Sequence, residues 1–320
     1  MAHRHLPLAV ALVSCMAAPA AAQSGVGVAG AQVLQLPAGS RAPALAGAYT
    51  AGYGDADLLF YNPAGAAALD RAVSVAYQSY FEDIVAGSGA AVFRLGALVV
   101  GAGLVFLDAG EVAEIVPDPA YGGQRGMETG QTVTASENAA RFAAAASLLD
   151  DRLRLGAAAG VVSSDLAGII RSAPFFDIGA QYAVRELTVG AVLKNLGGAM
   201  TSDTADDATL PTEARFGASY QMILGQGGLG AALAADVFHR MQEGTSGLAV
   251  GLEGGLMATP ELPLAAVVRA GVSVEAADEF LAPLRLGAGV AYGDIAVDYT
   301  YQSYDVLGSV HRFGLRWVRR

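Results

Sequence analysis

The sequence predicts an all-β fold, a transmembrane antiparallel β-barrel of about 14 strands. Three observations support this prediction. The chain begins with an export signal, it is 53% hydrophobic with a mean hydropathy of +0.42, and its apolar residues recur at every second position in several segments. It nevertheless lacks an uncharged apolar run of about 18 residues after the signal. An exported apolar chain without spanning helices can satisfy its backbone in lipid by closing a β-barrel.

The N-terminus reads as a secretory signal. After a short polar start comes an apolar stretch, residues 6–16, and then small residues at 20–22 that fit a cleavage site. We expect residues 1–22 to be removed. A rival interpretation treats Cys15 as the lipidated residue of a lipoprotein box. With ordinary cleavage the only cysteine is lost, so the mature protein has no disulfide and no cysteine-based metal site.

Charge excludes one class of partner. The full chain has 19 basic and 30 acidic residues, and loss of the signal removes one arginine and leaves a net charge near −12. This acidic balance lacks the basic footprint that nucleic acid requires, so we expect no nucleic-acid partner. The longest uncharged apolar stretch, residues 95–107, is too short for a spanning helix and is interrupted by Gly101 and Gly103.

Alternation defines the strands. In residues 294–303, apolar Val297 and Tyr299 share one face while Asp298 lies on the other, a period that helices do not show. Early strands are blurred by alanine and glycine on both faces. The expected strands are 73–80, 86–94, 97–107, 139–148, 152–162, 174–183, 187–195, 212–222, 229–238, 246–257, 264–275, 284–292, 294–303 and 309–318.

The connections alternate in length, as in barrels of the Gram-negative outer membrane. Long links, predicted at 108–138, 163–173, 196–211 and 275–283, alternate with tight turns. Both chain ends then lie on the periplasmic side. The aromatic residues expected at the periplasmic strand ends are Tyr182, Tyr220, Tyr292 and Trp317. The alternative is a soluble all-β protein, which would need a second sheet to cover the other apolar face.

Charged residues of both signs fall on the predicted inward face. They either pair with one another and fill the lumen, or line a polar path for a ligand. The cationic candidates are Arg141, Arg154, Lys194, Arg215, Arg269, Arg285, Arg312 and Arg316, and the acidic ones are Asp177, Asp236, Glu253, Glu275 and Asp298.

No catalytic constellation is readable, so we expect no enzyme, no cofactor and no metal. His239 and His311 lie on separate strand ends. Residues 225–230 match GxGxxG but join two strands, which is the wrong context for a nucleotide site. The Asp-rich stretch 201–210 could hold a cation, although a solvated loop is the simpler interpretation.

The longest predicted loop, residues 108–138, is acidic and carries the apolar residues Ile115, Val116 and Tyr121. Loops of this length are usually functional or disordered. One hypothesis is that these three residues anchor a partner protein while the acidic residues steer its approach. The alternative is a mobile lid without a partner.

The opening stretch of the mature chain contains Gly39-x-Arg41, Gly47-Ala48, Asp55-Ala56 and Asn62-Pro63-Ala64-Gly65. In this order the motifs resemble the start of the PorV/PorQ family of outer-membrane barrels, which are similar to FadL-like long-chain fatty acid transporters. The resemblance extends through residues 192–198 and 298–317 over nearly all of the mature chain. One departure is Gly54, which stands before Asp55 where the family usually has a paired acid. The motif positions are Gly39, Arg41, Gly47, Asp55, Asn62, Pro63 and Gly65.

The resemblance implies a plug or hatch segment, residues 23–72, inside a barrel formed by residues 73–318. The Asn62-Pro63 turn would reverse the chain within the periplasmic mouth; the alternative is a plain turn leading into the first strand. It also implies a docking or shuttle component of type IX-like protein secretion, with secretion subunits or exported proteins as partners. The alternative function is passive transport of small hydrophobic molecules across the outer membrane, whose lipid surrounds the barrel in either case.

Overall fold

The structure is a computed structural model that describes residues 29–80, 84–202, 207–224, 228–259, 262–275, 284–304 and 308–319. The expected signal, residues 1–22, lies outside these ranges, as do parts of the GxGxxG match and the Asp-rich stretch. None of the described helices is long and apolar enough to cross a membrane.

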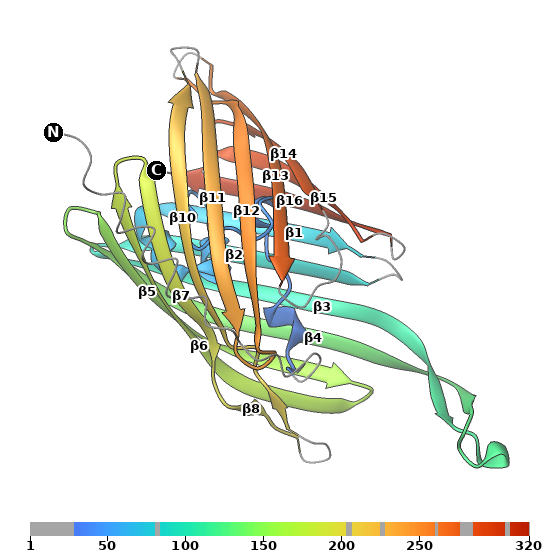
Figure 1. The fold of residues 1–320 in the computed structure, drawn as a ribbon. Helices are drawn as coiled ribbons and strands as arrows, with labels where there is room; N and C mark the ends of the chain where they lie inside the picture. Colours follow the sequence, from blue (N-terminus) through green and yellow to red (C-terminus); the bar gives the residue numbers. More distant parts are fainter. Residues whose placement is uncertain are drawn as a thin grey trace.

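Fourteen antiparallel strands close into a barrel in which β1 pairs with both β2 and β16, as predicted (Figure 1). A separate two-stranded sheet, β8 (Ala199–Met200) with β9 (Ala208–Thr209), lies between β7 and β10 in sequence. The barrel strands are β1 Arg71–Ser79, β2 Val85–Leu95, β3 Leu98–Pro117, β4 Gly126–Leu148, β5 Leu153–Leu166, β6 Ile169–Val184, β7 Leu187–Leu196, β10 Glu213–Leu224, β11 Leu229–Arg240, β12 Thr245–Leu256, β13 Leu264–Glu275, β14 Arg285–Tyr292, β15 Ile295–Ser303 and β16 Ser309–Arg319.

The predicted alternation is confirmed. On β15, Val297 is 56% exposed while its neighbour Asp298 is 1% exposed, and on β16 Phe313 is 55% exposed while Arg312 is fully buried. Apolar side chains therefore cover the outer face of the wall, which is the surface that a barrel presents to lipid. A closed barrel with this surface is the architecture of the Gram-negative outer membrane, and the protein belongs in that membrane.

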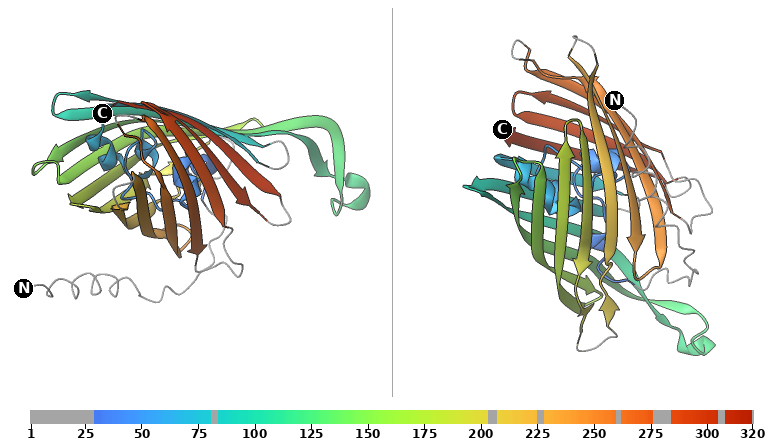
Figure 2. Two further views of the ribbon diagram at one scale, coloured as in Figure 1. Left: turned by 90° about the horizontal axis from the view of Figure 1, so that it is seen from above. Right: turned by 60° about the vertical axis from the view of Figure 1, so that its left-hand side comes forward.

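The two ends of the barrel differ. At one end, called here the turn end, short links such as residues 185–186 and 293–294 join the strands and contain positive-φ residues, including Arg185 and Gly293. At the other end, called the loop end, β3 and β4 continue past the rim as a paired hairpin that projects from the barrel (Figures 1 and 2).

The prediction of loops at 108–138 and 163–173 is wrong. Outside the membrane, strand pairing still satisfies the backbone N–H and C=O groups, so these segments continue as ladders. Val112 faces Val133 in the hairpin, whose register shifts between Asp108 and Glu111. Short helix η3 (Pro119–Tyr121) closes its tip, and β5 and β6 pair as far as Leu166 and Ile169.

Residues 29–70, called here the inner segment, pack against the inward face of the wall. The segment starts at the loop end, where Gly30 N donates to Thr209 O, and finishes at the turn end, where Arg94 donates to Leu69 O. It therefore runs along the lumen and is not confined to one mouth. Its helices are η1 Gln32–Leu34, α2 Arg41–Ala44, α3 Leu58–Tyr61 and η2 Pro63–Ala68.

Small residues on the wall make room for the inner segment. Helix η2 packs on β4, β5 and β6, and a Cβ on Gly156 of β5 would lie 2.4 Å from Ala64 N. Leu58, Leu59 and many alanines of the wall share one buried cluster. This contact explains why alanine and glycine occupy the inward face of the early strands and blur their alternation.

The lipid-facing register can be tested on β12. Leu252 points outward from the middle of the strand, so Leu252→Arg should lower the free energy of unfolding by about 2–4 kcal/mol. Leu229, an outward residue at the end of β11, is the matched control, because arginine near an interface costs only about 0–1 kcal/mol. Urea unfolding in lipid vesicles measures both, and equal effects would contradict the register or the depth.

Candidate functional site in the barrel lumen

The Asn62-Pro63 turn lies inside the barrel, away from lipid. Asn62 is fully buried; its Oδ1 accepts from Ala64 N at 3.1 Å, while its Nδ2 donates to Thr50 O at 2.8 Å and to Ala180 O of β6 at 3.2 Å. Pro63 occupies the first position of η2, where its missing N–H costs nothing. The turn thus caps a short helix and ties the inner segment to the wall.

Of the other motif residues in the inner segment, Gly39 and Gly65 are buried and Gly47 is half-buried. Gly39 has φ +72° and donates its N–H to Ser88 Oγ; a Cβ there would collide with the Asp57 carboxylate, so only glycine fits. Gly47 accepts a hydrogen bond on its carbonyl from Arg215, and Gly65 lies against Gln181 and Leu58.

Six charged side chains form a closed ring between the inner segment and the wall. The Arg41 guanidinium donates to both carboxylate oxygens of Glu253, at 3.0 and 2.8 Å. Arg269 then bridges Glu253 at 2.5 Å and Asp298 at 2.7 Å. Arg316 contacts Asp298 at 2.5 Å and Asp55 at 3.7 Å, and Asp55 returns to Arg41 at 3.5 Å. We call these six residues the ion ring: Arg41, Glu253, Arg269, Asp298, Arg316 and Asp55.

The ion ring is electrically balanced and almost dry. Its side chains are between 0 and 12% exposed, and each cation lies between two carboxylates. Tyr49 and Tyr53 reinforce it, because the Tyr49 hydroxyl donates to Asp55 and the Arg41 guanidinium stacks over the Tyr53 ring at 4.4 Å. Sequence reasoning missed both tyrosines, which no motif distinguishes.

A further carboxyl group, that of Asp57, lies beside the ion ring. The pKa of Asp57 is raised to about 7: burial is the largest cause and the negative charge of Asp55 adds to it, while a hydrogen bond from Ser74 of β1 and the charge of Arg316 lower the pKa. Asp298 also faces it and raises the pKa. At neutral pH the Asp57 carboxyl group is therefore partly protonated, at the place where the inner segment contacts β1.

Most other predicted lumen charges also find partners. Arg141 pairs with Asp177 at 2.7 Å, and Arg215 contacts Glu213 at 3.3 Å and Asp236 at 3.6 Å. Asp236 also accepts from the backbone N–H groups of Tyr49 and Thr50. The remaining ones lack a carboxylate within 4 Å among the described residues: Arg154 and Arg312, which donate to glutamines, together with Lys194 and Arg285.

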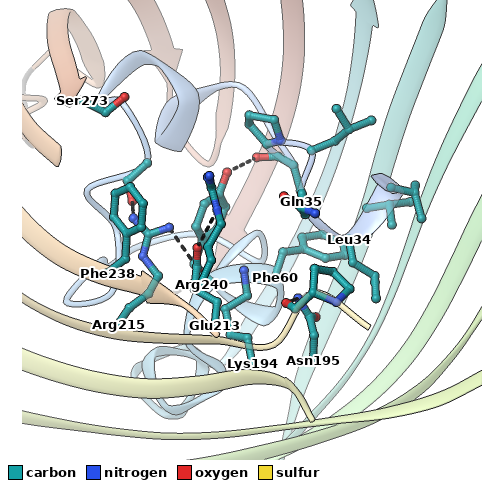
Figure 3. Close-up of a pocket in the computed structure, with 18 of the residues that line it drawn as sticks. Leu34, Gln35, Phe60, Lys194, Asn195, Glu213, Arg215, Phe238, Arg240 and Ser273 are labelled. Carbon is teal, nitrogen blue, oxygen red and sulfur yellow. Dashed lines mark hydrogen bonds and ion pairs between the residues drawn. The ribbon is translucent and has the colours of Figure 1, made fainter. Parts of the chain in front are cut away.

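Two separate cavities flank the inner segment. An outer cavity of about 250 Å³ opens toward the loop end and is lined by Gln35, Phe60, Lys194, Arg215 and Phe238 among others (Figure 3). An inner cavity of about 710 Å³ lies at the turn end, beneath the ion ring, with Met222, Ile223 and Val267 in its lining. The two linings share no residue.

The predicted partner-loop residues lie on the projecting hairpin. Ile115 is 63% and Tyr121 53% exposed, Val116 is half-buried, and the Arg125 guanidinium lies over the Tyr121 ring. The two candidate histidines are far from each other in the sheet: His239 contacts Ser246, and His311 contacts Tyr299 and Ser309. No cluster of potential metal ligands occurs among the described residues.

No family model matches the chain, and no curated protein matches its sequence. Solved structures do share its fold. The toluene transporter TbuX of Ralstonia pickettii superposes with a TM-score of 0.60 at 14% identity, covering 88% of this chain and 98% of the other. The P. putida toluene transporter TodX (0.56, 12%, 88% and 96%) and a Pseudomonas aeruginosa FadL homologue (0.55, 11%, 88% and 99%) are also similar. At these identities the likeness concerns the fold.

The ion ring should hold the inner segment in place. Arg41→Gln leaves Glu253 and Asp55 buried beside fewer cations, a change that costs about 3–5 kcal/mol when a buried pair is broken. A single cysteine placed at buried Ala51 should then react with a maleimide at least about 100-fold faster. Arg94→Gln is the control, because its pair with half-exposed Asp70 is worth about 0–1 kcal/mol. Equal labelling rates would show that the ring does not hold the segment.

The stability with which the inner segment is held against the barrel wall should also depend on pH. A carboxyl group whose pKa is raised in the folded protein stabilises it fully below the unfolded pKa, near 3.8, and this contribution is lost as the pH rises toward about 7. The Ala51 cysteine should therefore become more reactive between pH 5 and 8, relative to the same cysteine in Asp57→Asn. This ratio cancels the pH dependence of the thiol, and a constant ratio would contradict the assignment.

Proposed function

We propose that this protein is a passive transporter of small hydrophobic molecules across the outer membrane, with the inner segment as its plug. The observation that carries the proposal is the division of the lumen into two cavities by a segment whose covalent link to the wall is its continuation into β1. A molecule that enters at the loop end reaches the outer cavity first. The molecule then enters the inner cavity when the inner segment shifts.

The chemistry of the cavities supports this proposal. Both linings combine apolar or aromatic residues with charged ones, so a small molecule would find apolar surface in either cavity. The similar structures include transporters of toluene, which is a small hydrophobic molecule. In the proposed domain division, residues 23–72 form the plug and residues 73–318 the barrel.

The secretion role implied by the sequence resemblance receives no support from the comparisons, and none of the three similar structures described is an enzyme. One observation favours a docking function for part of the molecule, namely the hairpin with exposed Ile115 and Tyr121. The hairpin lies beyond the barrel rim, so docking and transport reside in separate parts and can be tested separately.

A disulfide between the inner segment and the wall tests transport. A Cβ on Gly314 would lie 2.9 Å from Ser40 Cβ, so a small shift brings the Ser40→Cys, Gly314→Cys pair to the roughly 3.8 Å that a disulfide requires. Removal of the expected signal, residues 1–22, would take away Cys15, the one cysteine of the sequence. In toluene-degrading cells without their own transporter, toluene consumption at low concentration should fall under oxidising conditions and recover on reduction. The Ser40→Cys single variant controls for the oxidant.

If the locked protein supports the same rate of toluene consumption as the reduced one, the plug assignment is wrong. If neither form supports more consumption than cells without the protein, transport of this class of molecule is wrong.

Deletion of residues 111–134 separates the two functions. The deletion removes the hairpin beyond the pair Asp108–Ser136; it shortens the β3–β4 ladder to that pair and leaves the ladders of β3 with β2 and of β4 with β5 intact. We expect unchanged toluene consumption, together with loss of any partner that co-purifies with the full-length protein. Lost consumption with normal barrel assembly would place the transport path in the hairpin, contrary to the proposal.

A further inference from the structure

The outer cavity is lined by more cations than carboxylates. Its lining includes five cationic side chains, Arg141, Lys194, Arg215, Arg240 and Arg285, but only two carboxylates, Glu213 and Glu275. Further carboxylates contact some of these cations from outside the cavity lining. The question is therefore which cations of the lining have a carboxylate in direct contact.

The two carboxylates of the cavity lining already form ion pairs with arginines of the same lining. Glu213 lies 3.3 Å from Arg215 and 3.6 Å from Arg240, and Glu275 lies 2.6 Å from Arg240. Arg141 pairs with Asp177, Arg215 also contacts Asp236 at 3.6 Å, and Arg240 also contacts Glu243 at 3.6 Å. Three of the five cations are thus compensated by carboxylates in hydrogen-bond or ion-pair contact.

Lys194 and Arg285 are the two cations of the outer cavity without such a carboxylate contact among the described residues. Lys194 is only 9% exposed and faces Glu213 across the strands, but within the described part of the chain its ammonium makes no hydrogen bond and no ion pair within 4 Å; the Tyr61 ring lies 5.7 Å away. The Nε of Arg285 is buried without a hydrogen-bond partner. Neither cation has a carboxylate within 4 Å among the described residues, so an anion in the cavity would offset the cost of burying them.

Tyr61 connects the two cations. Its ring lies 5.7 Å from the Lys194 ammonium, its hydroxyl donates to Ala38 O, and it lines the same cavity as Arg285. Phe60, Tyr61 and Phe238 contribute aromatic surface to the same cavity. At about 250 Å³ the cavity is below the roughly 300–1,000 Å³ of drug-sized sites, so its ligand is small and has little room for a long chain.

We infer that the outer cavity is a binding site for a small aromatic carboxylate, with Lys194 and Arg285 neutralising the carboxylate and Phe60, Tyr61 and Phe238 contacting the ring. The inference rests on the proposed function, because it names the class of molecule that the transporter selects first. Neutral hydrocarbons of the same shape fill the apolar part of the site but leave both cations unpaired.

Binding of benzoate to the purified barrel in detergent, measured by calorimetry, tests the inference. Toluene and benzylamine are the matched ligands, since they keep the ring and replace the negative charge by no charge or a positive one. Benzoate should bind more tightly than either by about 10-fold or more, the range expected for charge-assisted hydrogen bonds.

The Lys194→Met, Arg285→Met double variant should lose this preference and bind benzoate about as weakly as toluene. Lys194→Arg should retain it, because the charge is kept. Arg94→Gln, which removes a cation from the opposite end of the barrel, should bind benzoate like the unaltered protein. Heat-modifiable migration on gels reports whether each variant still folds as a barrel.

Benzoate binding no tighter than benzylamine binding in the unaltered protein would overturn the inference without any variant. Unchanged benzoate affinity in the folded double variant would overturn the assignment to these two residues. Neither outcome affects the disulfide experiment, which reports on transport. Conversely, tight benzoate binding with no uptake in that experiment would leave the anion site standing and refute the transport function.

Discussion

The ion ring is the interaction on which the arrangement of the lumen depends. Arg41 and Asp55 come from the inner segment, while Glu253, Arg269, Asp298 and Arg316 come from β12, β13, β15 and β16. Buried ion pairs contribute little net stability compared with well-packed apolar groups, because desolvation offsets their attraction. What they do provide is discrimination, since any other placement of the segment would leave buried charges unpaired. The ring therefore specifies where the segment lies more than it adds to the stability of the barrel.

Packing on the opposite side of the lumen complements this electrostatic attachment. Where β12 to β16 hold the segment by charge, β2 to β6 hold it through close contact between small residues, as at Gly156 against Ala64. Glycine on the wall lets two backbones approach to a distance that a Cβ would prevent. The abundance of glycine in the chain is thus a consequence of a lumen filled by polypeptide, because a wide water-filled lumen would not require it.

Most of the barrel could be predicted because each strand carries its own evidence. The alternation of Val297 with Asp298 follows from a period of two, and it locates lipid and lumen without knowledge of any other strand. Pairing across the lumen could not be predicted in this way. Arg41 and Glu253 are 212 residues apart, and inward-facing carboxylates on several strands were equally plausible partners. For the same reason Lys194 and Arg285 were recognised as lumen residues but not as the ones without a carboxylate.

The direction in which the inner segment runs through the barrel could also not be predicted from the sequence. The Asn62-Pro63 turn indicates a reversal, but both mouths of a barrel can accommodate one, and the contact of Gly30 with Thr209 depends on a loop-end strand pair far along the chain. The projecting hairpin escaped prediction for a different reason: its alternation is weak, and its acidic, glycine-containing sequence is also typical of a loop.

The two sides of the inner segment differ in how their charges are satisfied, and this difference gives the lumen a polarity. Above the inner cavity, the ion ring closes on itself, so a molecule there meets a neutral roof with apolar walls that include Met222 and Ile223. In the outer cavity, the ammonium of Lys194 has no carboxylate within 4 Å among the described residues. Because charges interact more strongly where water is excluded, an anion in the proposed outer site would gain an attraction that the balanced ion ring does not offer on the inner side. A partition with unequal faces captures a ligand on one side and releases it on the other without any input of energy, provided that the concentration gradient points inward.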